Sequence, residues 1–552
     1  MEYGTELTQL MGAVRDGKPL PEKVSPRDRR ALADFASQVF PFDSLVPEVY
    51  AGWRPLVRDA FHFFAEHLTA ERLLPKLQEQ MKLPSSEPLG SRLLRLIARM
   101  PTLQKLGQVV ARNPHLAPEL RVQLSTLENG IDDLDLAEAR CEAERQLGDR
   151  MGRYAIELGG KLAEGSVAVV MTFSWLEPES GERREGVFKV LKPYVREFLE
   201  EELELLAELA DLLEERRSRY GLGALAFRRV FHDVRELLAR EIEFTAEQAE
   251  LAAATRRFAG FPGVRVPSCM PQLCTESLTA MSLERGQKIT EFASAPPRER
   301  RRIGERLVAA SLLWPLFVEA GEGVLHADPH AGNLFWDSEQ GTLILLDWAL
   351  VEKLEGEERR HAAKLGAAVL LRDETLTMEA LDRLCPEYVK RKDRRERAAA
   401  VVADVFQSFP VSSLPSSRDI LSLLDALARA GVEFPGPLVI LRKVLFTLEG
   451  VLASLDASVS LESTVFSAEW LSRLLPQPAP SIAELSSRIP RVPFRLSDWL
   501  DVGWSAGWLP YRLSRQVGQR WAGELLGLGR AAIGPDLESA ANRDIAVVDC
   551  SG

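Results

Sequence analysis

The chain has 552 residues and a mass of 61.5 kDa, which at roughly 150 residues per domain leaves room for about three to four domains. Apolar residues make up 46% and charged residues 27% of the chain, as in folded globular proteins and unlike disordered ones. The 69 Lys and Arg against 81 Asp and Glu leave a net charge of -12, and without a long basic block this argues against a nucleic-acid-binding protein.

Two further features bear on where the protein works. No stretch reaches the roughly 18 uninterrupted apolar residues of a membrane span, and residues 1–6 lack the basic and apolar parts of a signal peptide. The five cysteines form no disulfide framework, and Cys269 and Cys274 lie five apart with no histidine nearby to complete a zinc site. We therefore expect a cytoplasmic, reduced protein.

The first part of the chain predicts helices. Apolar residues recur at three- and four-residue steps in residues 29–40 and 56–68. Residues 83–90 hold two prolines, two serines and a glycine, which indicates a boundary. Residues 91–146 have a helical pattern again, with a break near Asn129-Gly130.

The pattern then changes to strands. Runs rich in Val, Ala and Ile at 154–173 and 186–191 predict a hairpin, with its turn at residues 179–182. An acidic helical run is expected at 198–217, and a further helical run at 228–258. Short strands are expected after them, at 264–267 and 278–281.

Beyond residue 286 helices dominate, interrupted by a strand-like run at 343–350, and the Pro-rich residues 475–481 set off a tail. A small β-containing lobe followed by a helical lobe, with helices before both, is an α+β plan. The predicted segments are a helical region at 1–90, a helical extension at 91–150, the β-containing lobe at 151–285, the helical lobe at 286–475 and the tail at 476–552.

The strongest chemical pattern is a short polar loop followed by a second carboxylate. Residues 325–335 read Leu-His-Ala-Asp-Pro-His-Ala-Gly-Asn-Leu-Phe, and fourteen residues after Asn333 an apolar run ends at Asp347. Phosphoryl transfer needs one carboxylate to align the attacking hydroxyl or water, and oxygen ligands to hold Mg²⁺ on a triphosphate. Asp328, Asn333 and Asp347 supply these groups, so the pattern predicts a site that uses ATP and Mg²⁺.

Such a site also needs a lysine on a strand, placed to contact the nucleotide phosphates, and a helix carboxylate to hold that lysine. Lys189 lies in the apolar run Val-Phe-Lys-Val-Leu of the predicted hairpin; the alternative is an ordinary edge-strand lysine. Glu241 and Glu243 lie on a helix crowded with carboxylates. From spacing alone, each is more typical of a solvated face than of a partner for Lys189.

Residues 162–170, upstream of Lys189, are a candidate phosphate-binding loop whose backbone N–H groups would face the nucleotide. Because the segment has a single glycine, an ordinary hairpin turn explains it equally well. The candidate nucleotide contacts are Leu162, Ala163, Glu164, Gly165, Ser166 and Val170.

Together these segments resemble the UbiB/AarF/ADCK family of atypical protein-kinase-like proteins, over about residues 95–460. The specific core of the resemblance is the K-x-G-Q signature at residues 105–108 together with residues 326–333. Glu241-Ile242-Glu243 corresponds to the E-x-D motif of the family. Residues 113–120, 448–451 and 455–456 also look like the family.

The resemblance implies a protein-kinase-like two-lobe fold and a role for each residue. Lys189 would contact the phosphates and pair with Glu241. Asp328 would be the carboxylate of the catalytic loop, and Asn333 and Asp347 would bind Mg²⁺.

Lys105 and Gln108 would lie on an extension that folds over the nucleotide site, where protein substrates dock in ordinary kinases. The resemblance therefore implies an ATPase or a small-molecule kinase rather than a protein kinase. It also implies a role in the biosynthesis of ubiquinone or another isoprenoid quinone, close to membranes, with a quinone or isoprenoid lipid intermediate as a possible partner.

The chain departs from the family pattern in four places. Glu164 and Gly165 stand where small alanines are expected, and Glu243 replaces an aspartate. Trp348-Ala349 replaces the usual Phe-Gly, and since Ala349 reaches positive φ less cheaply than glycine, we expect the flip of this loop to be restricted. The tail, finally, has none of the hydrophobic spans that often end bacterial relatives.

The tail has a distinctive composition. Trp499, Trp504, Trp508 and Trp521 are four of the ten tryptophans of the chain, and residues 495–530 hold five arginines against three acids, a charge of +2. Tryptophan with arginine on an amphipathic helix is typical of a peripheral membrane anchor, here at the inner membrane face. The alternative is a helix that packs its tryptophan face on the helical lobe.

Two other functions stay open. Small-molecule phosphotransferases of the aminoglycoside and choline kinase type also carry H-x-D-x-H-x-x-N followed by D-W, but they lack the K-x-G-Q segment. A non-catalytic, nucleotide-gated scaffold is the other, although Lys189, Asp328, Asn333 and Asp347 are all present. The phosphoryl acceptor and the oligomeric state are not determined by the sequence.

Overall fold

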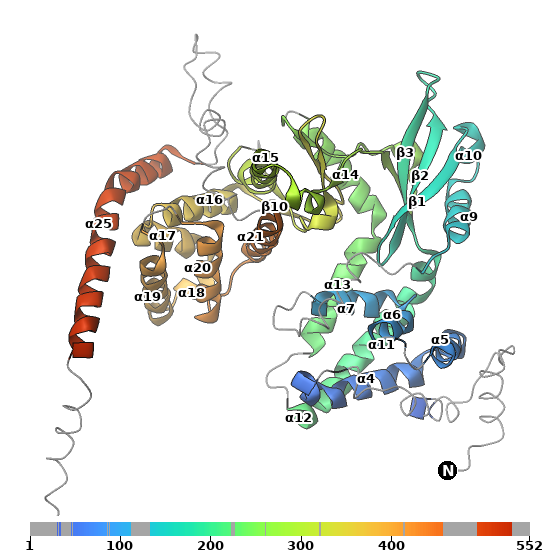
Figure 1. Ribbon diagram of the computed structural model, residues 1–552, viewed down its shortest axis with the longest axis horizontal. Helices are drawn as coiled ribbons and strands as arrows, with labels where there is room; N and C mark the ends of the chain where they lie inside the picture. The colour runs from blue at the N-terminus through green and yellow to red at the C-terminus, as the bar shows by residue number, and fades with distance from the viewer. Residues whose placement is uncertain are drawn as a thin grey trace, which may run out of the picture. The chain divides into compact units, whose positions relative to one another are not determined.

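The computed structural model of the chain describes residues 30, 33–34, 46, 48–84, 87, 89–111, 133–221, 227–259, 261–318, 322–411, 415–455 and 494–532. Most of the predicted helix at 29–40, the family-like residues 113–120, Asp456 and the Pro-rich residues 475–481 lie outside these ranges. The chain divides into two compact units (Figure 1). The first unit is Met1–Arg256, Val266–Arg285 and Asp347–Ala349, and the second is Arg257–Arg265, Gly286–Leu346 and Leu350–Gly552.

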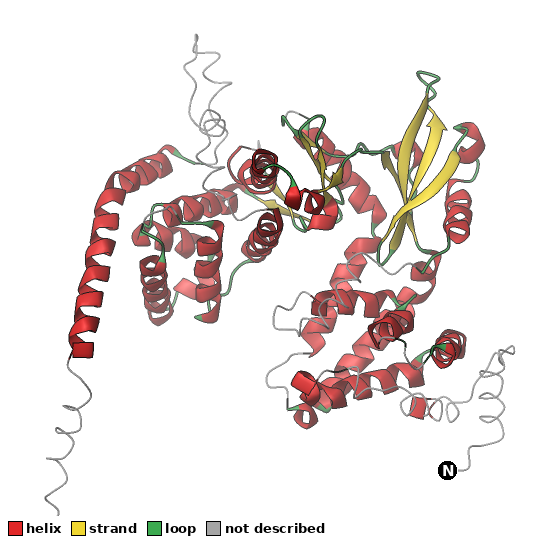
Figure 2. Cartoon of the chain, viewed as in Figure 1, coloured by secondary structure: helices red, strands yellow, loops and turns green. Residues whose placement is uncertain are grey.

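The first unit contains an antiparallel sheet in the order β1-β2-β3-β5 (Figure 2). Alternating side chains of β2, from Val169 to Trp175, point into the core, as the two-residue period of a strand requires. The predicted hairpin is confirmed as the β2–β3 pair. The strands are β1 (Glu157–Glu164), β2 (Ala168–Leu176), β3 (Arg183–Leu191) and β5 (Leu278–Ser282).

A glycine in β3 permits an aromatic stack inside this sheet. The rings of Phe173 and Phe188 lie parallel with centroids 3.7 Å apart. A Cβ at Gly186 would lie 2.5 Å from the Phe173 ring, which is closer than carbon atoms can approach. Gly186 therefore leaves the space that Phe173 occupies.

The helices of the first unit precede and follow the β1–β3 strands, and α7 packs against α11 and α13 (Figure 1). Before the sheet come η1 (Glu48–Trp53), α4 (Arg54–His67), α5 (Ala70–Lys82), α6 (Leu89–Ile97), α7 (Pro101–Ala111), α9 (Leu136–Leu147) and α10 (Arg150–Arg153). After β3 come α11 (Pro193–Glu215), α12 (Arg217–Tyr220), α13 (Phe227–Ile242), α14 (Phe244–Phe258) and the short η3 (Pro271–Leu273).

Residues 228–258 are helical as predicted, except that the chain breaks at Glu243 between α13 and α14. The carbonyl of Glu243 accepts hydrogen bonds from the N–H groups of Ala246 and Glu247, which starts α14 in a new direction. The next residue, Phe244, is fully buried and its ring lies 5.5 Å from the ammonium of Lys189. Burial of Phe244 against this cation gives a physical reason for the break.

The second unit has a small sheet ordered β4-β9-β8-β6 and a β10-β7 ribbon, followed by helices (Figure 2). Its strands are β4 (Val264–Arg265), β6 (Gln287–Lys288), β7 (Gly323–His326), β8 (Leu334–Asp337), β9 (Thr342–Leu345) and β10 (Val351–Leu354). The β8–β9 hairpin carries Asn333 at one end, immediately before β8.

The helical part of the second unit packs in chain order, with α16 on α17, α17 on α19, α19 on α20 and α20 on α21. None of the helices within the described ranges is long and apolar enough to cross a membrane. The elements are η4 (Ile289–Ser294), α15 (Pro297–Val308), η5 (Ala309–Val318), η6 (Ala331–Asn333), α16 (Gly356–Leu370), α17 (Glu374–Leu384), α18 (Pro386–Val389), α19 (Lys392–Ser408), α20 (Ser417–Arg429), α21 (Gly436–Leu455) and α25 (Leu496–Ala532).

Candidate functional site

The strand lysine of the first unit is held by a carboxylate that the sequence analysis did not single out. Lys189 on β3 donates to Oε1 of Glu247 on α14 at 2.7 Å, and its ammonium lies 3.8 Å from Oδ1 of Asp347. The expected pairing of Lys189 with Glu241 is therefore corrected to Glu247. Glu247 follows Glu241 by six residues, beyond the helix break, and only the break brings it opposite β3.

Burial and the nearby carboxylates act on Lys189 in opposite directions. Burial alone would lower the pKa of Lys189, but the charges of Asp347, Glu247 and Glu241 outweigh it and raise the pKa above its usual value. Lys189 is thus a permanent cation, suited to a phosphate group. Burial raises the pKa of Glu247, against the attraction of Lys189.

The second carboxylate oxygen of Glu247 makes no hydrogen bond to a described residue. Oε2 of Glu247 is buried and has no hydrogen-bond partner among the residues that the structure describes. A buried carboxylate oxygen without a donor is costly unless a water or a ligand hydrogen satisfies it. The oxygen therefore marks a place next to Lys189 where the protein fits a further polar group.

Glu241 has a different partner from the one expected. Its Oε1 accepts from Lys105 on α7, and its Oε2 is 3.4 Å from the hydroxyl of Ser166, in the turn between β1 and β2. Glu241 therefore joins the K-x-G-Q helix to the candidate nucleotide loop within the first unit. Gln108 lies on the same helix, but its side chain is outside what the structure describes.

A second buried carboxylate fixes the start of α7. Oε2 of Glu202 on α11 accepts from both the backbone N–H and the hydroxyl of Thr102, at 3.0 and 2.7 Å, and its other oxygen pairs with Arg72. The N–H groups of the first helical turn have no partner within the helix, so this carboxylate satisfies one of them. Lys105 is thereby presented by a helix anchored at its N-terminus.

The candidate nucleotide loop is a tight turn between β1 and β2, and the Glu164 side chain forms ion pairs with two lysines. The N–H of Gly165 donates to the carbonyl of Ala168 at 2.8 Å, which closes the turn between β1 and β2. Glu164 is buried, with its carboxylate 2.7 Å from Lys192 and 2.8 Å from Lys161. Any contact of Glu164 with the nucleotide would therefore come from its backbone, since its carboxylate is held by these two lysines.

The other candidate nucleotide contacts on β1 and β2 do not all lie close to Lys189. Leu162 on β1 is exposed, and Ala163 pairs with Val170 across the β1–β2 hairpin. Val170 is also the direct cross-strand neighbour of Lys189 on β3. Val170 therefore belongs to the surroundings of Lys189.

The predicted catalytic loop of the second unit is tied together by a histidine. The N–H of Asp328 donates to Nδ1 of His326 at 3.3 Å, so Nδ1 carries no hydrogen and Nε2 does. Nε2 lies 2.9 Å from the carbonyl oxygen of Leu346, to which it donates. His326 thus joins the backbone at Asp328 to the residue before Asp347.

Lys443 contacts the predicted catalytic carboxylate. Its ammonium, on α21, lies 3.1 Å from Oδ1 of Asp328. The sequence analysis missed Lys443, although it and Arg442 are the only basic residues of the mostly apolar segment 436–455. A cation in so apolar a helix is a signal that could have found it.

The two predicted metal ligands occur where the β8–β9 hairpin ends. The carbonyl of Asn333 accepts from the N–H of Leu346 at 2.9 Å, and Asp347 is the next residue along the chain. Asp347 has a left-handed backbone, with φ of 51°, and its Oδ1 accepts from the N–H of Ala349 at 3.1 Å. Aspartate tolerates this conformation better than most residues.

The residue with positive φ in this segment is Asp347 and not Ala349. Trp348 between them is almost completely buried. Its burial, rather than the backbone of Ala349, gives the segment a fixed position.

Comparisons with known proteins agree with these features. Residues 163–381 match the ABC1 atypical kinase-like domain. The chain is 26% identical over 439 residues to a probable protein kinase UbiB of Xanthomonas oryzae pv. oryzae, covering 77% of this chain and 76% of that protein. A probable protein kinase UbiB of Sodalis glossinidius is 25% identical over 432 residues, covering 73% of this chain and 76% of the relative.

A solved structure is also similar. The complex structure of Rv3197 and erythromycin from Mycobacterium tuberculosis is 17% identical to this chain, covers 66% of this chain and 89% of that one, and has a TM-score of 0.45. The predicted α+β, two-lobe kinase-like fold with a helical extension is confirmed. The match of residues 163–381 to the ABC1 atypical kinase-like domain and the similarity to proteins named probable protein kinase UbiB support the resemblance to the UbiB/AarF/ADCK family.

Proposed function

We propose that the protein binds ATP with Mg²⁺ and transfers or hydrolyses its terminal phosphoryl group, as an atypical kinase or ATPase of UbiB type. The single observation that supports this most is the placement of Lys189, buried on β3 between Glu247 at 2.7 Å and Asp347 at 3.8 Å. A permanent cation next to a metal-binding carboxylate is the arrangement that kinase-like sites use to hold a triphosphate.

The donor set fits magnesium. Asn333 and Asp347 offer amide and carboxylate oxygens, which are hard ligands of the kind that Mg²⁺ prefers. Among the described residues no cluster of three or more His, Cys, Asp or Glu could hold a metal by itself. This suits an ion that keeps several waters and binds through one or two side chains and the substrate phosphates.

Asp328 would align the attacking oxygen, which is the role that a catalytic-loop carboxylate has in kinases. The contact of its carboxylate with Lys443 holds it in one orientation. Whether the acceptor is water or a small molecule depends on groups that would lie beyond Asp328.

Lys105 supports the UbiB type over an aminoglycoside or choline kinase type. The pairing of Lys105 with Glu241 joins the K-x-G-Q helix to residues next to Lys189, and the alternative group lacks this segment. We infer that α7 restricts which acceptors reach the nucleotide, in favour of water or a small molecule. The acceptor class proposed here is an isoprenoid lipid or quinone intermediate, as the family resemblance implies.

Thermal stability measured with and without Mg-ATP tests the nucleotide site. We expect Mg-ATP to raise the melting temperature of the full chain, and Asp347→Asn to abolish most of this rise. Asp382→Asn, which removes a surface carboxylate paired with Arg395 on the helical part, is the matched control and should leave the rise intact. An unchanged rise in Asp347→Asn would refute the metal assignment.

Quinone profiles of a deletion strain test the pathway. Wild-type protein should restore the isoprenoid quinone content and Asp347→Asn should not. If wild type and Asp347→Asn restore the quinone content equally, the protein supports the pathway without phosphoryl transfer. If the deletion leaves every quinone unchanged, the proposed acceptor class is wrong.

A further inference from the structure

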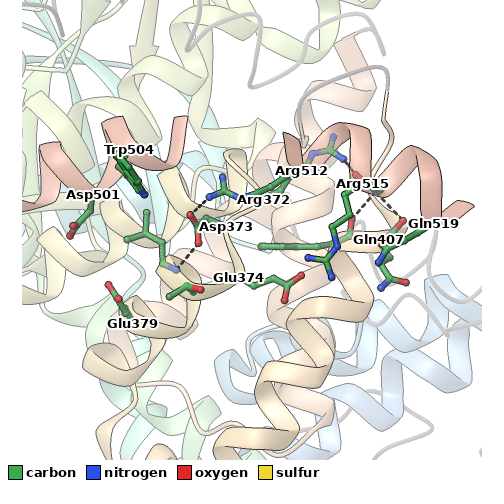
Figure 3. A pocket seen from close by; sticks show the side chains of 14 residues that line it. Arg372, Asp373, Glu374, Glu379, Gln407, Asp501, Trp504, Arg512, Arg515 and Gln519 are labelled. Atoms are coloured by element: carbon green, nitrogen blue, oxygen red, sulfur yellow. Dashed lines mark hydrogen bonds and ion pairs between the residues drawn. The ribbon is translucent and has the colours of Figure 1, made fainter. Parts of the chain in front are cut away.

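A cavity of about 470 Å³ in the second unit belongs to the docking of α25, and Figure 3 shows charged side chains of both signs around it. Polar side chains hold the helix on the helical part, while the four tryptophans of the helix stay between 43% and 73% exposed. These contacts are those of Asp498 with Arg360 and Lys364, of Ser505 and Arg512 with Asp373, and of Gln516 with Arg372. Because these groups are used in holding α25, the cavity does not by itself indicate a ligand.

Two cysteines of the first unit, by contrast, lie close together and have no part in the proposed site. The sulfur atoms of Cys269 and Cys274 are 3.7 Å apart, and both thiols are free. The residues between them form the single turn η3, closed by a hydrogen bond of 2.9 Å from the N–H of Leu273 to the carbonyl of Met270. A disulfide bond is about 2.05 Å long, so an approach of roughly 1.7 Å would join the two sulfurs.

The backbone holds both cysteines beside the same strand. Cys269 forms an antiparallel bridge with Met281 of β5. The carbonyl of Cys274 accepts from the guanidinium of Arg150 at 2.7 Å. With both backbones fixed in this way, small rotations of the two side chains are enough to bring the sulfurs together.

The two thiols differ in access and in reactivity. Cys269 is partly exposed, whereas Cys274 is buried. The hydrogen bond with Cys274 lowers the pKa of the Cys269 thiol, against the opposing effects of burial and of the Glu247 charge. Since the thiolate is the form that reacts with oxidants, Cys269 is the first to be attacked and Cys274 stands next to it as the resolving thiol.

The sulfur of Cys274 is bonded to the strand next to Lys189. It accepts from the N–H of Ala280 at 3.2 Å and lies 3.6 Å from the carbonyl oxygen of the same residue. Ala280 on β5 pairs with Phe188 on β3, the residue before Lys189. A move of this sulfur toward Cys269 therefore weakens a contact of the strand pair that carries Lys189.

The segment after Cys274 is also bonded to α14. The side-chain amide of Gln248 donates to three oxygen atoms of residues 275–279, at 2.9, 3.2 and 3.1 Å. Gln248 follows Glu247, the partner of Lys189, along the helix. A shift at the cysteines thus reaches both members of the Lys189–Glu247 pair through short chains of hydrogen bonds.

We propose that Cys269 and Cys274 are a redox site, which closes into a reversible disulfide when the protein meets hydrogen peroxide, and that the disulfide weakens nucleotide binding at Lys189. The second half of this proposal rests on the proposed function, whereas the first half does not. In a reducing compartment the pair stays a dithiol, and disulfides that form there are typically transient and redox-sensing.

The oxidation runs in two balanced steps. The Cys269 thiolate attacks one oxygen of the peroxide, so that an S–O bond forms, the O–O bond breaks and the leaving hydroxide takes up the thiol proton as water. The sulfur of Cys274 then attacks the sulfenic acid of Cys269, so that the S–S bond forms, the S–O bond breaks and the hydroxide leaves as water with the Cys274 proton. Two thiols have lost two electrons, one peroxide has become two waters, and a dithiol reductant reverses the change.

Mass analysis of the full chain tests the disulfide without reference to ATP. After a short treatment with hydrogen peroxide the chain should lose the mass of two hydrogen atoms, and the thiols that can be alkylated after denaturation should fall from five to three. Peptide mapping should join Cys269 to Cys274, and dithiothreitol should restore all five thiols. Cys269→Ser should abolish the link. Cys141→Ser is the matched control, because Cys141 is an exposed cysteine of the same unit, and it should leave the link intact.

The melting temperature tests the effect on the nucleotide site. Reduced wild-type protein should show the full rise with Mg-ATP, and the oxidised protein at most half of it. Cys269→Ser should keep the full rise with and without peroxide. If the reduced protein shows no rise, the proposed function fails, while the mass analysis still decides whether the disulfide forms.

Four results would overturn the proposal. The disulfide is excluded if peroxide leaves both thiols free, if it takes Cys269 to the sulfinic acid without a link to Cys274, or if it links two chains through Cys141 instead. The coupling to Lys189 is excluded if the disulfide forms and the rise with Mg-ATP does not change.

Discussion

The ammonium group of Lys443 lies 3.1 Å from the carboxylate of Asp328, although the two residues are far apart in the sequence. Asp328 comes from the loop after β7, and Lys443 from the helix α21. Both residues belong to the second unit. The contact brings α21, which lies beyond the matched kinase-like domain at residues 163–381, to the predicted catalytic carboxylate.

Replacing Lys443 should therefore slow turnover more than it weakens nucleotide binding. We expect Lys443→Ala to lower kcat for ATP hydrolysis by about 10²-fold, as is typical when a group that orients a catalytic carboxylate is lost, with a small change in KM. Arg442→Ala is the matched control, because Arg442 pairs instead with Asp425 at 2.5 Å. Equal losses in both variants would show that the charge of α21, and not the contact with Asp328, is what matters.

Replacing Glu247 and replacing Glu241, the two glutamates near Lys189, should have different effects. Glu247→Gln removes the partner of Lys189, and we expect it to reduce the stabilisation by Mg-ATP while α7 stays in place. Glu241→Gln weakens the contact with Lys105, and we expect faster hydrogen exchange in residues 101–111. Lys105→Met should have the same effect on α7 as Glu241→Gln. If Glu247→Gln loosens α7 as much as Glu241→Gln does, the assignment of partners is wrong.

Removing one member of a buried ion network should destabilise the first unit strongly. Lys192 is fully buried, 2.9 Å from Asp133 and 2.7 Å from Glu164. Lys192→Met removes the cation that pairs with Asp133 and leaves Glu164 with Lys161 alone. Removing one partner of a buried ion pair typically costs about 3–5 kcal/mol in the free energy of unfolding. Urea unfolding measures this.

The control for Lys192 is its partly exposed neighbour. Lys161 lies 2.8 Å from Glu164, and Lys161→Met should cost about 1 kcal/mol or less. The double variant Lys192→Met/Glu164→Gln should recover part of the lost stability, since one uncompensated charge is gone. A Lys192→Met protein as stable as wild type would contradict the network.

The docking of α25 should depend on pH through Asp498. Burial would raise the pKa of Asp498, but the N–H of Arg495 and the charges of Arg360 and Lys364 outweigh it, so the pKa is lowered in the folded protein. A lowered carboxyl pKa stabilises the fold above the unfolded value of about 4 and loses this effect as the pH falls below it.

Hydrogen exchange of residues 496–519 should therefore accelerate as the pH is lowered below about 4, after correction for the intrinsic pH dependence of exchange. Asp498→Asn removes the titrating group, and the corrected exchange should be fast already at pH 6. Asp501→Asn is a useful comparison, because Asp501 is exposed and contacts only one of the two cations, Lys364. A profile in wild type without any step near this pH would argue against Asp498 as an anchor.

The sequence predicted the site residues that are close together along the chain, and it missed those that only tertiary contacts bring to the site. The spacing of Asp328, Asn333 and Asp347 is local, because one loop and one hairpin connect them, and local spacing can be read from sequence. Glu247 and Lys443 could not be assigned in this way. Glu247 lies opposite Lys189 only because the chain breaks at Glu243, and Lys443 reaches Asp328 only through the packing of the helical part.

By itself the sequence determined the α+β plan and the β2–β3 hairpin, and it predicted the candidate residues for ATP and Mg²⁺, because strand alternation, helical periodicity and motif spacing are short-range properties. Only the tertiary structure decided which carboxylate pairs with Lys189 and which face of α25 is turned outward. The composition of α25 permits either face to be buried. The partners Arg360, Lys364, Arg372 and Asp373 on the lobe bury the polar one, since buried charges require partners while exposed tryptophans do not.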